Sequence, residues 1–279
     1  MTIYACSDLH YGHCRKGDAA VRSLARHLLD IGRESDQLLV GGDIATCDAT
    51  ITSCLDLFSA FPGQRMAIAG NHDVWVLPEE QRNSWDRYER LPDLFRAAGF
   101  HPLEESPIEV NERVFVGSMG WYDYSFQDEI GIPIEEYRAK RSSRVGGMWG
   151  DAYYARLPCN DVAMTEIMVE RLRTALEQVK DAAEVIVLTH HLPSKGLLFH
   201  PRCLVPKRWR YLNAFLGSRA LGQVITRFSN VRHVVCGHIH AHKSIRENGI
   251  RMTSIGGGYQ SKMLLCLDGD SLKTVTFRS

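Results

Sequence analysis

The sequence predicts an α/β protein whose sheet is largely parallel over most of the chain. Two observations support this prediction. Short apolar runs alternate with helical patterns as far as about residue 236, and the following residues read as strand, turn, strand. The chain has 279 residues, 44% of them hydrophobic, which is ample for one large core or two smaller ones. We expect a single domain over residues 1–279.

Six apolar runs have the length and composition of buried strands. They cover residues 3–6, 37–40, 65–69, 114–116, 184–188 and 231–236. Helical patterns lie near residues 18–31, 48–60, 79–97, 162–180 and 208–227. Strands that alternate with helices in this way are typical of parallel sheets.

The last part of the chain has a different pattern, from about residue 243 to residue 277. Asn248-Gly249 and Asp268-Gly269 are dipeptides that favour tight hairpin turns. An antiparallel edge or a second sheet is therefore expected after Cys236.

One long stretch, residues 121–160, fits neither pattern. A connection of this length in a compact domain is usually functional or disordered, and its aromatic content argues against disorder. Its aromatic residues are Trp121, Tyr122, Tyr124, Phe126, Trp149, Tyr153 and Tyr154. Its cations, and a second basic group further on, are Lys140, Arg141, Arg144, Lys207, Arg208 and Arg210. Two interpretations stay open: a cap-like insertion that selects the substrate, or aromatic side chains that pack the stretch against the body while the charges face water.

Composition excludes some classes of protein. Lys+Arg and Asp+Glu both number 33, and zero net charge disfavours a strongly basic nucleic-acid binder. No apolar run reaches the ~20 residues that span a bilayer, and the first residues lack the pattern of a signal peptide. The eight cysteines form no Cys-x-x-Cys pair, so we expect reduced, mostly buried thiols and a cytoplasmic protein.

Five short polar segments each follow, or closely follow, a predicted strand. Asp8 and His10 are two residues apart, so in an extended chain they would face the same way. Asp43 follows two glycines at the end of the next strand. The other three segments are Asn71-His72-Asp73, His190-His191 and His238-Ile239-His240.

Taken singly, the first three segments have ordinary explanations such as chance, a turn or a helix cap, whereas paired histidines in a core would both need hydrogen-bond partners. Together they all lie where ligands bind in open α/β sheets, beyond the carboxyl ends of the strands. Their ligands are oxygen and nitrogen atoms without thiolate, a set that suits Mn, Fe, Zn or Ni. Seven ligands are too many for one ion with an open position, but they suffice for two ions that share a carboxylate.

In these five blocks, which occur in order over residues 8–240, the chain resembles the calcineurin-like metallophosphoesterase superfamily. The pattern of that family is Asp-x-His, Gly-Asp, Gly-Asn-His-Asp/Glu, a lone His and Gly-His-x-His. The resemblance implies two facing mixed β-sheets flanked by helices, a four-layer α/β/β/α sandwich. It also implies Asp8, His10 and His240 as ligands of one metal, Asn71, His190 and His238 as ligands of the other, Asp43 as the bridge, His72 as general acid and Asp73 as the partner of His72.

The function implied by the resemblance is hydrolysis of a phosphodiester or phosphomonoester by a metal-bridging hydroxide. The expected cofactors are two divalent ions, with manganese favoured over Fe, Zn or Ni. The expected partner is a small phosphate ester, without a membrane and with nucleic acid disfavoured; no oligomeric state is predicted. The alternatives are a nuclease, a protein phosphatase, or a non-catalytic scaffold for binding proteins.

Three further residues are candidate substrate contacts: His13, His191 and Arg144. Only one of the adjacent His190 and His191 should bind metal. In the family that ligand directly follows the strand, which leaves His191 to line the site. For His13 the alternative is an exposed loop histidine, and for Arg144 a charge that faces water. The remaining histidines, His27, His101, His200, His233 and His242, are treated as ordinary.

Overall fold

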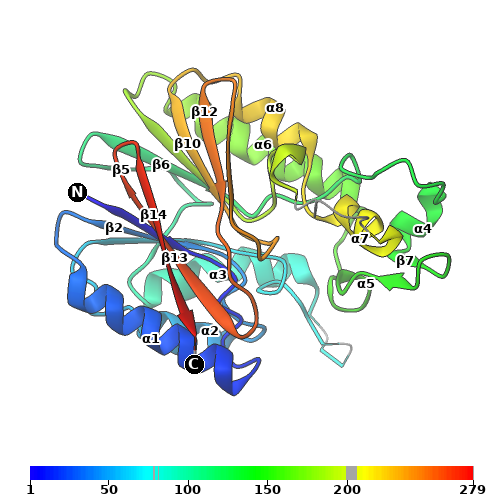
Figure 1. Cartoon of the computed structure of the whole chain (residues 1–279), viewed down its shortest axis with the longest axis horizontal. Helices are drawn as coiled ribbons and strands as arrows, with labels where there is room; N and C mark the ends of the chain where they lie inside the picture. Colours follow the sequence, from blue (N-terminus) through cyan, green and yellow to red (C-terminus); the bar gives the residue numbers. More distant parts are fainter. Residues whose placement is uncertain (78, 81, 199–205, 279) are drawn as a thin grey trace.

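The computed structural model describes residues 1–77, 79–80, 82–198 and 206–278. Two six-stranded mixed sheets face each other, and helices cover both outer faces (Figure 1), which confirms the expected four-layer α/β/β/α class. The first sheet has the order β14-β13-β1-β2-β3-β4. Its strands are β1 (Ile3–Cys6), β2 (Gln37–Gly41), β3 (Gln64–Ile68), β4 (His101–Pro102), β13 (Ser261–Asp268) and β14 (Ser271–Arg278).

The second sheet has the order β11-β12-β10-β9-β6-β5. Its strands are β5 (Ile108–Val110), β6 (Arg113–Ser118), β9 (Val185–Thr189), β10 (Val231–Cys236), β11 (Lys243–Glu247) and β12 (Ile250–Ser254). The central strands of each sheet pair in parallel, whereas the edges contributed by β13, β14, β11 and β5 are antiparallel.

Alternation along the strands separates two faces of each sheet. In β1, Tyr4 and Cys6 pack under helices, while Ile3 and Ala5 join the core between the sheets. The outer face of the first sheet is covered by α1 (Arg15–Ile31), α2 (Asp48–Asp56) and α3 (Ser84–Ala97), and that of the second by α6 (Asp161–Gln178) and α8 (Arg219–Ile225). The inner core thus fixes how the two sets of strand ends meet.

Two helical predictions need correction. The pattern near 79–97 becomes a helix only from Ser84, where the side chain of Asn83 caps α3. The pattern near 208–227 divides into α7 (Lys207–Leu212), the short 3₁₀ helix η2 (Asn213–Phe215) and α8. The break has a packing reason: Gly217 forms a bridge with Leu192, and a Cβ on Gly217 would lie 2.1 Å from the Leu192 carbonyl oxygen.

The hairpins of the final part are confirmed, but they divide between the sheets. β11 and β12 are joined by Asn248 and Gly249, both with left-handed backbone (φ 50° and 81°), and add an edge to the second sheet. β13 and β14 extend the first sheet. Asp268 pairs with Ser271, so the turn there consists of Gly269 and Asp270 rather than Asp268-Gly269.

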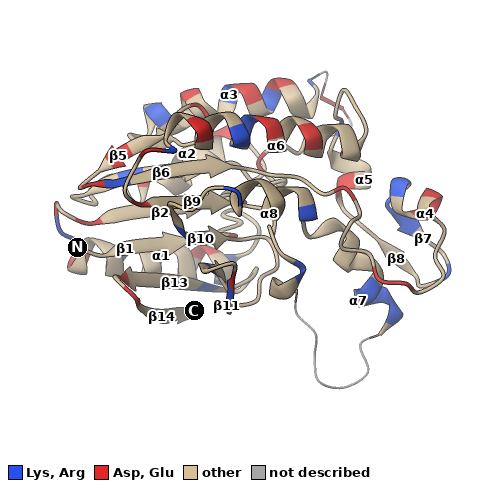
Figure 2. Cartoon of the chain, turned by 90° about the horizontal axis from the view of Figure 1, so that it is seen from above, with Lys and Arg blue, Asp and Glu red and all other residues tan. Residues whose placement is uncertain are grey.

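The 121–160 segment has its own small elements: α4 (Ile134–Arg138), β7 (Arg141–Ser142), β8 (Gly147–Met148) and α5 (Asp151–Tyr154). They lie together with α7 beside the sandwich (Figure 1), and cations gather on α4, β7 and α7 (Figure 2). The packing interpretation holds for the buried residues Trp121, Tyr122, Tyr124 and Phe126, whereas Tyr153 is 49% exposed.

The cysteines within the described residues are free. Cys6, Cys54 and Cys236 are buried as expected, whereas Cys14, Cys159 and Cys266 are partly exposed and Cys47 is exposed, so the expectation of mostly buried thiols is wrong for these four. Cys203 and His200 lie outside the described residues. In the part of the chain that the structure describes, no helix combines the length and apolarity needed to cross a bilayer.

Candidate metal centre

Five loops meet at the carboxyl ends of the central strands of both sheets. The loops follow β1, β2 and β3 of the first sheet and β9 and β10 of the second. Backbone hydrogen bonds tie neighbouring loops together: Asp8 N–H donates to Gly42 O at 3.0 Å, and His10 N–H donates to Asp43 O at 2.8 Å. Because the two sheets face each other, their strand ends converge on one region of the molecule.

The backbone of these loops is left-handed, not extended as the Asp-x-His and His-x-His spacing suggested. The residues concerned are Asp8 (φ 56°), His10 (42°), Asp43 (52°), His238 (71°) and His240 (55°). Such a conformation costs a non-glycine residue roughly 1–2 kcal/mol and persists only where the surroundings enforce it. Its concentration at five of the seven predicted ligands marks the region as a functional site.

One group of ligand atoms comes from Asp8, His10 and His240. His10 Nε2 lies 3.0 Å from His240 Nε2, and His240 Nε2 lies 3.3 Å from Asp8 Oδ1. Burial lowers the pKa of His10 to about 3, so its ring is neutral and offers a lone pair. Two imidazoles and a carboxylate that converge this closely could hold one cation.

A second group comes from Asn71, His190 and His238. His190 Nε2 lies 3.2 Å from Asn71 Oδ1 and 3.1 Å from His238 Nδ1. The opposite ring nitrogens donate to backbone carbonyls, His190 Nδ1 to Gly41 O and His238 Nε2 to Phe215 O. This pairing leaves the inward nitrogens free to bind a metal, the usual arrangement for histidine ligands.

Asp43 lies between the two groups. Its Oδ1 is 3.3 Å from His190 Nε2, and its Oδ2 is 3.7 Å from His10 Nε2. Burial lowers the pKa of His190, but the charges of Asp43 and Asp8 outweigh burial and raise it to about 9. The same negative charge would attract a metal cation in place of that proton, and Asp43 has the position of a bridging ligand.

His72 lies next to both groups and borders an open cavity. Its Nε2 is 3.8 Å from Asp43 Oδ2, and its side chain is 15% exposed. Its ring stacks on Trp75 with 3.6 Å between centroids and 25° between planes. Burial lowers the pKa of His72, against the opposing effect of the Asp43 charge.

Asp73 has a different position from the one expected. Its buried carboxylate accepts hydrogen bonds from the backbone N–H groups of Ile44 (2.8 Å), Ala45 (3.0 Å) and Gly70 (2.8 Å). No hydrogen bond among the described residues joins it to the His72 ring. Asp73 therefore holds together the loops that carry Asp43 and Asn71, because unpaired backbone N–H groups there would be costly.

The three candidate substrate contacts have different surroundings. His191 is fully buried against Trp121, with Nδ1 donating to the Met119 carbonyl, and this burial excludes a direct substrate contact. The Arg144 side chain is 59% exposed and pairs with Glu136 at 2.6 Å, which agrees with the alternative of a charge that faces water. His13 stays a candidate, since it shares a small cavity with His10 and His72.

Sequence reasoning missed several residues that shape this centre. Tyr259 packs against His10 (4.6 Å between centroids) and His13 (4.4 Å). Buried Lys262 donates to the carbonyls of Asp8 (2.8 Å) and Gly258 (2.6 Å) and so supports the left-handed turn at Asp8. The glycine run before Tyr259 was the local signal for a loop that approaches the site closely.

A cavity of about 660 Å³ opens beside the two groups. Four polar residues of the centre lie on one side of it: Asp43, His72, His238 and His240. The rest of its wall is mostly apolar: Trp149, Pro206, Trp209, Leu212, Asn213, Leu216, Ile239, Ala241 and Tyr259. This size is within the range of small-molecule sites.

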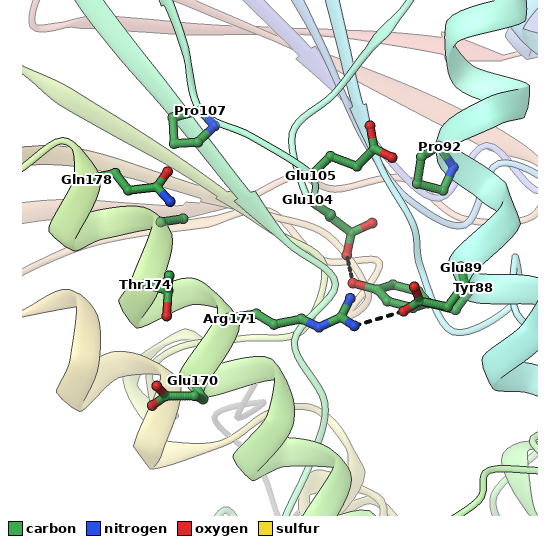
Figure 3. A pocket seen from close by; sticks show the side chains of 11 residues that line it. Tyr88, Glu89, Pro92, Glu104, Glu105, Pro107, Glu170, Arg171, Thr174 and Gln178 are labelled. Atoms are coloured by element: carbon green, nitrogen blue, oxygen red, sulfur yellow. Dashed lines mark hydrogen bonds and ion pairs between the residues drawn. The ribbon is translucent and has the colours of Figure 1, made fainter.

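A separate pocket of about 540 Å³ lies between α3, α6 and the segment before β5 (Figure 3). Four of its polar groups are paired with one another, Tyr88 with Glu104 and Arg171 with Glu89. Glu104 also accepts from the backbone N–H of Ala69, directly before the Asn71 loop. This pocket contains none of the predicted ligands, and we assign it a structural role.

Comparison with known proteins identifies the family. The family model of calcineurin-like phosphoesterases matches residues 1–242. The [acyl-carrier-protein] phosphodiesterase PptH of Mycobacterium tuberculosis is 25% identical over 274 residues, which cover 92% of this chain and 78% of that protein. The 3′,5′-cyclic adenosine monophosphate phosphodiesterase CpdA of Vibrio vulnificus is 33% identical over 75 residues, 25% of this chain and 27% of that protein.

Solved structures show the same fold. The crystal structure of the phosphopantetheinyl hydrolase PptH from Mycobacterium tuberculosis has a TM-score of 0.73 at 23% identity, with 93% of this chain and 90% of that chain covered. A dimetal phosphatase from Danio rerio has a TM-score of 0.54 at 12% identity, with 100% and 98% covered. Because the family model spans most of the sequence and its motifs meet in one centre, this chain belongs to the calcineurin-like phosphoesterase family and is a hydrolase of phosphate esters.

Proposed function

We propose that this chain is a phosphodiesterase that uses two divalent metal ions. One ion would be held by Asp8, His10 and His240, the other by Asn71, His190 and His238, with Asp43 shared between them. The convergence of these seven side chains, most of them fully buried and on left-handed loops, is the observation that supports the proposal. Their oxygen and nitrogen atoms suit Mn, Fe, Zn or Ni, and manganese is the ion we would test first.

The chain's own residues account for the proton that the reaction requires. When bound, paired divalent ions would supply Lewis acidity toward a phosphoryl group and lower the pKa of water. His72 borders the cavity on the side of the ligands, and Trp75 holds its ring by stacking. We assign to His72 Nε2 the proton that the leaving oxygen needs, a contribution of about 10²–10⁴-fold in general acid catalysis.

The cavity narrows the class of substrate. Trp149, Leu212 and Ile239 form an apolar wall next to the polar centre. A phosphodiester with a long uncharged substituent matches such a wall better than a highly charged phosphate chain does. This match, together with the printed names of the relative PptH, supports a phosphopantetheinyl group joined to a carrier protein as the leading substrate. Trp149 comes from the 121–160 segment, which we therefore propose to act as a cap.

The test uses the whole chain stripped of metal with a chelator. Turnover of bis(p-nitrophenyl) phosphate should be absent, return with manganese and disappear again with excess chelator. A carrier protein bearing phosphopantetheine should then lose the mass of that group. Turnover of the nitrophenyl ester with an unchanged carrier protein would reject the substrate but keep the hydrolase. Absence of metal-dependent turnover with every ester would reject the hydrolase and favour a scaffold.

Cyclic nucleotides are the second candidate, because of the local similarity to CpdA. Cyclic AMP and a short single-stranded DNA belong in the same panel of substrates. Preferred cleavage of the DNA, with affinity that falls steeply as salt rises, would support the nuclease alternative.

The adjacent histidines offer a test of the second ligand group. His190→Ala should lower manganese binding to the group that contains Asn71 and His238, because it removes a nitrogen at the centre of that group. His191→Ala should keep manganese binding, since its ring is buried against Trp121. Calorimetric titration of metal-stripped protein measures both. Equal losses in the two variants would contradict the choice of His190.

A further inference from the structure

Asp151, at the start of α5, is a buried carboxylate that no metal motif contains. Its residue is 1% exposed. Oδ1 accepts from Asn71 Nδ2 (3.0 Å) and Trp75 Nε1 (2.6 Å), and Oδ2 accepts from Tyr122 Oη (2.8 Å) and Trp149 Nε1 (2.7 Å). All four donors are neutral. Burying a carboxylate is costly unless hydrogen bonds compensate, so four donors on one side chain point to a specific task.

The first task concerns the orientation of Asn71. The amide group of asparagine carries an acceptor oxygen on one side and a donor nitrogen on the other, and its neighbours decide which of them points in a given direction. The Asp151 carboxylate accepts from all four of its partners, and from Asn71 it accepts on the Nδ2 side. The Oδ1 side is then turned toward His190 Nε2, 3.2 Å away, in the second ligand group. Without this constraint the amide could turn its N–H₂ group toward a metal ion, and that group would repel the ion.

The second task concerns the position of His72. The same Oδ1 atom holds the indole of Trp75, and the face of that indole lies 3.6 Å from the His72 ring. The ring of Tyr154, three residues after Asp151, also stacks on this indole, with 4.8 Å between the ring centroids. Thus Asp151 Oδ1, in the 121–160 segment, binds both the proposed metal ligand Asn71 and the indole on which the proposed acid His72 stacks.

We propose that Asp151 is a positioning residue that orients Asn71 toward the second metal ion and, through Trp75, fixes His72. This inference rests on the proposed function. It also implies that the 121–160 segment does more than cover the cavity: removing it would disturb metal binding as well as substrate choice.

The chain offers a matched control in Asp161, at the start of α6. Asp161 is also buried, at 4% exposure, and also accepts from an indole, Trp121 Nε1 at 2.9 Å, and from a phenol, Tyr124 Oη. It differs in pairing with Lys140 at 2.7 Å and in having no hydrogen bond to a proposed ligand. A general effect of removing a buried charge should appear in both variants, whereas an effect on the centre should appear only at Asp151.

The experiment compares Asp151→Asn and Asp161→Asn by calorimetric titration of the metal-stripped chain with manganese. Asp151→Asn should weaken one of the two binding events by about 10–100-fold, the usual effect of removing a partner that orients a ligand, and Asp161→Asn should change neither by more than about threefold. In combination with Asn71→Ala, the Asp151→Asn change should add little further loss, because both act through the same amide.

Trp75→Phe separates the second task, because it keeps the Asp151 carboxylate and its hydrogen bond with Asn71. It keeps an aromatic face under His72 but removes the N–H that Asp151 holds. We expect manganese affinity to persist while kcat for an alkyl phosphodiester falls about tenfold more than kcat for a nitrophenyl ester. If Asp151→Asn does not fold, this variant decides: equal kcat changes with both esters would overturn the inference.

The remaining outcomes are distinguishable. Unchanged manganese binding in Asp151→Asn, or an equal loss in Asp161→Asn, would overturn the inference while leaving the proposed function intact. Failure of the unsubstituted chain to bind any of manganese, iron, zinc and nickel would instead reject the proposed function.

Discussion

Asp43→Asn is expected to weaken binding of both metal ions at once and to lower turnover by at least about 10²-fold, since even a group that only orients a ligand is commonly worth 10–100-fold in metal affinity. The physical reason is the position of the carboxylate. Its two oxygens face different ligand groups, Oδ1 toward His190 and Oδ2 toward His10. The amide removes the shared negative charge and turns one acceptor into a donor.

The measurement is metal content after gel filtration, together with calorimetric titration. Asp36→Asn is a suitable control. Asp36 is buried directly before β2, at the end of that strand opposite to Asp43. Its carboxylate accepts hydrogen bonds from the backbone N–H groups of Thr2 and Arg33. The control should lose stability but keep metal affinity. If Asp43→Asn still carried two ions per chain, the bridging role would be wrong.

His72→Ala should keep its metal ions and lose rate according to the leaving group. For an alkyl phosphodiester, whose departing oxygen must be protonated, we expect a loss of about 10²–10⁴-fold in kcat. For a nitrophenyl ester the loss should be far smaller, because that oxygen leaves as a stable anion. His72 fits this role because it borders the cavity while its backbone N–H is held by Asp43 Oδ1 at 2.9 Å.

A series of phosphodiesters with leaving groups of increasing pKa would measure this effect. The slope of log kcat against leaving-group pKa should be steeper for His72→Ala than for the unsubstituted chain. Metal content must be recorded beside it, since His72 also lies within reach of an ion held by His10 and Asp43. Loss of an ion in His72→Ala, or equal rate losses with all esters, would show that His72 is a ligand and not the acid.

The strands and the motif residues were predictable because their signals are local. Each ligand directly follows or closely follows an apolar strand, so strand pattern and motif spacing together located Asp8, Asp43, Asn71, His190 and His238. The hairpin dipeptide Asn248-Gly249 was equally readable, because its two positive φ angles depend on those residues alone.

Local signals did not reveal how the backbone reaches the centre. The spacing of Asp8 and His10 suggested an extended chain, yet both are left-handed. That conformation is stabilised by partners far away in the chain, such as Lys262, which donates to the Asp8 carbonyl. Asp73 was assigned to the neighbouring ring of His72, but it binds the backbone of a loop some thirty residues earlier.

Which side chains can bind a metal, and in which order they occur, is written in the sequence, because residue type sets ligand chemistry and strand ends set the approximate place. Which way those side chains turn was decided by tertiary contacts. Asn71 faces its group because Asp151, 80 residues later, accepts its N–H₂, and His191 is excluded from the cavity because Trp121 packs on it. Such contacts join residues without any sequence periodicity, so only the folded chain specifies them.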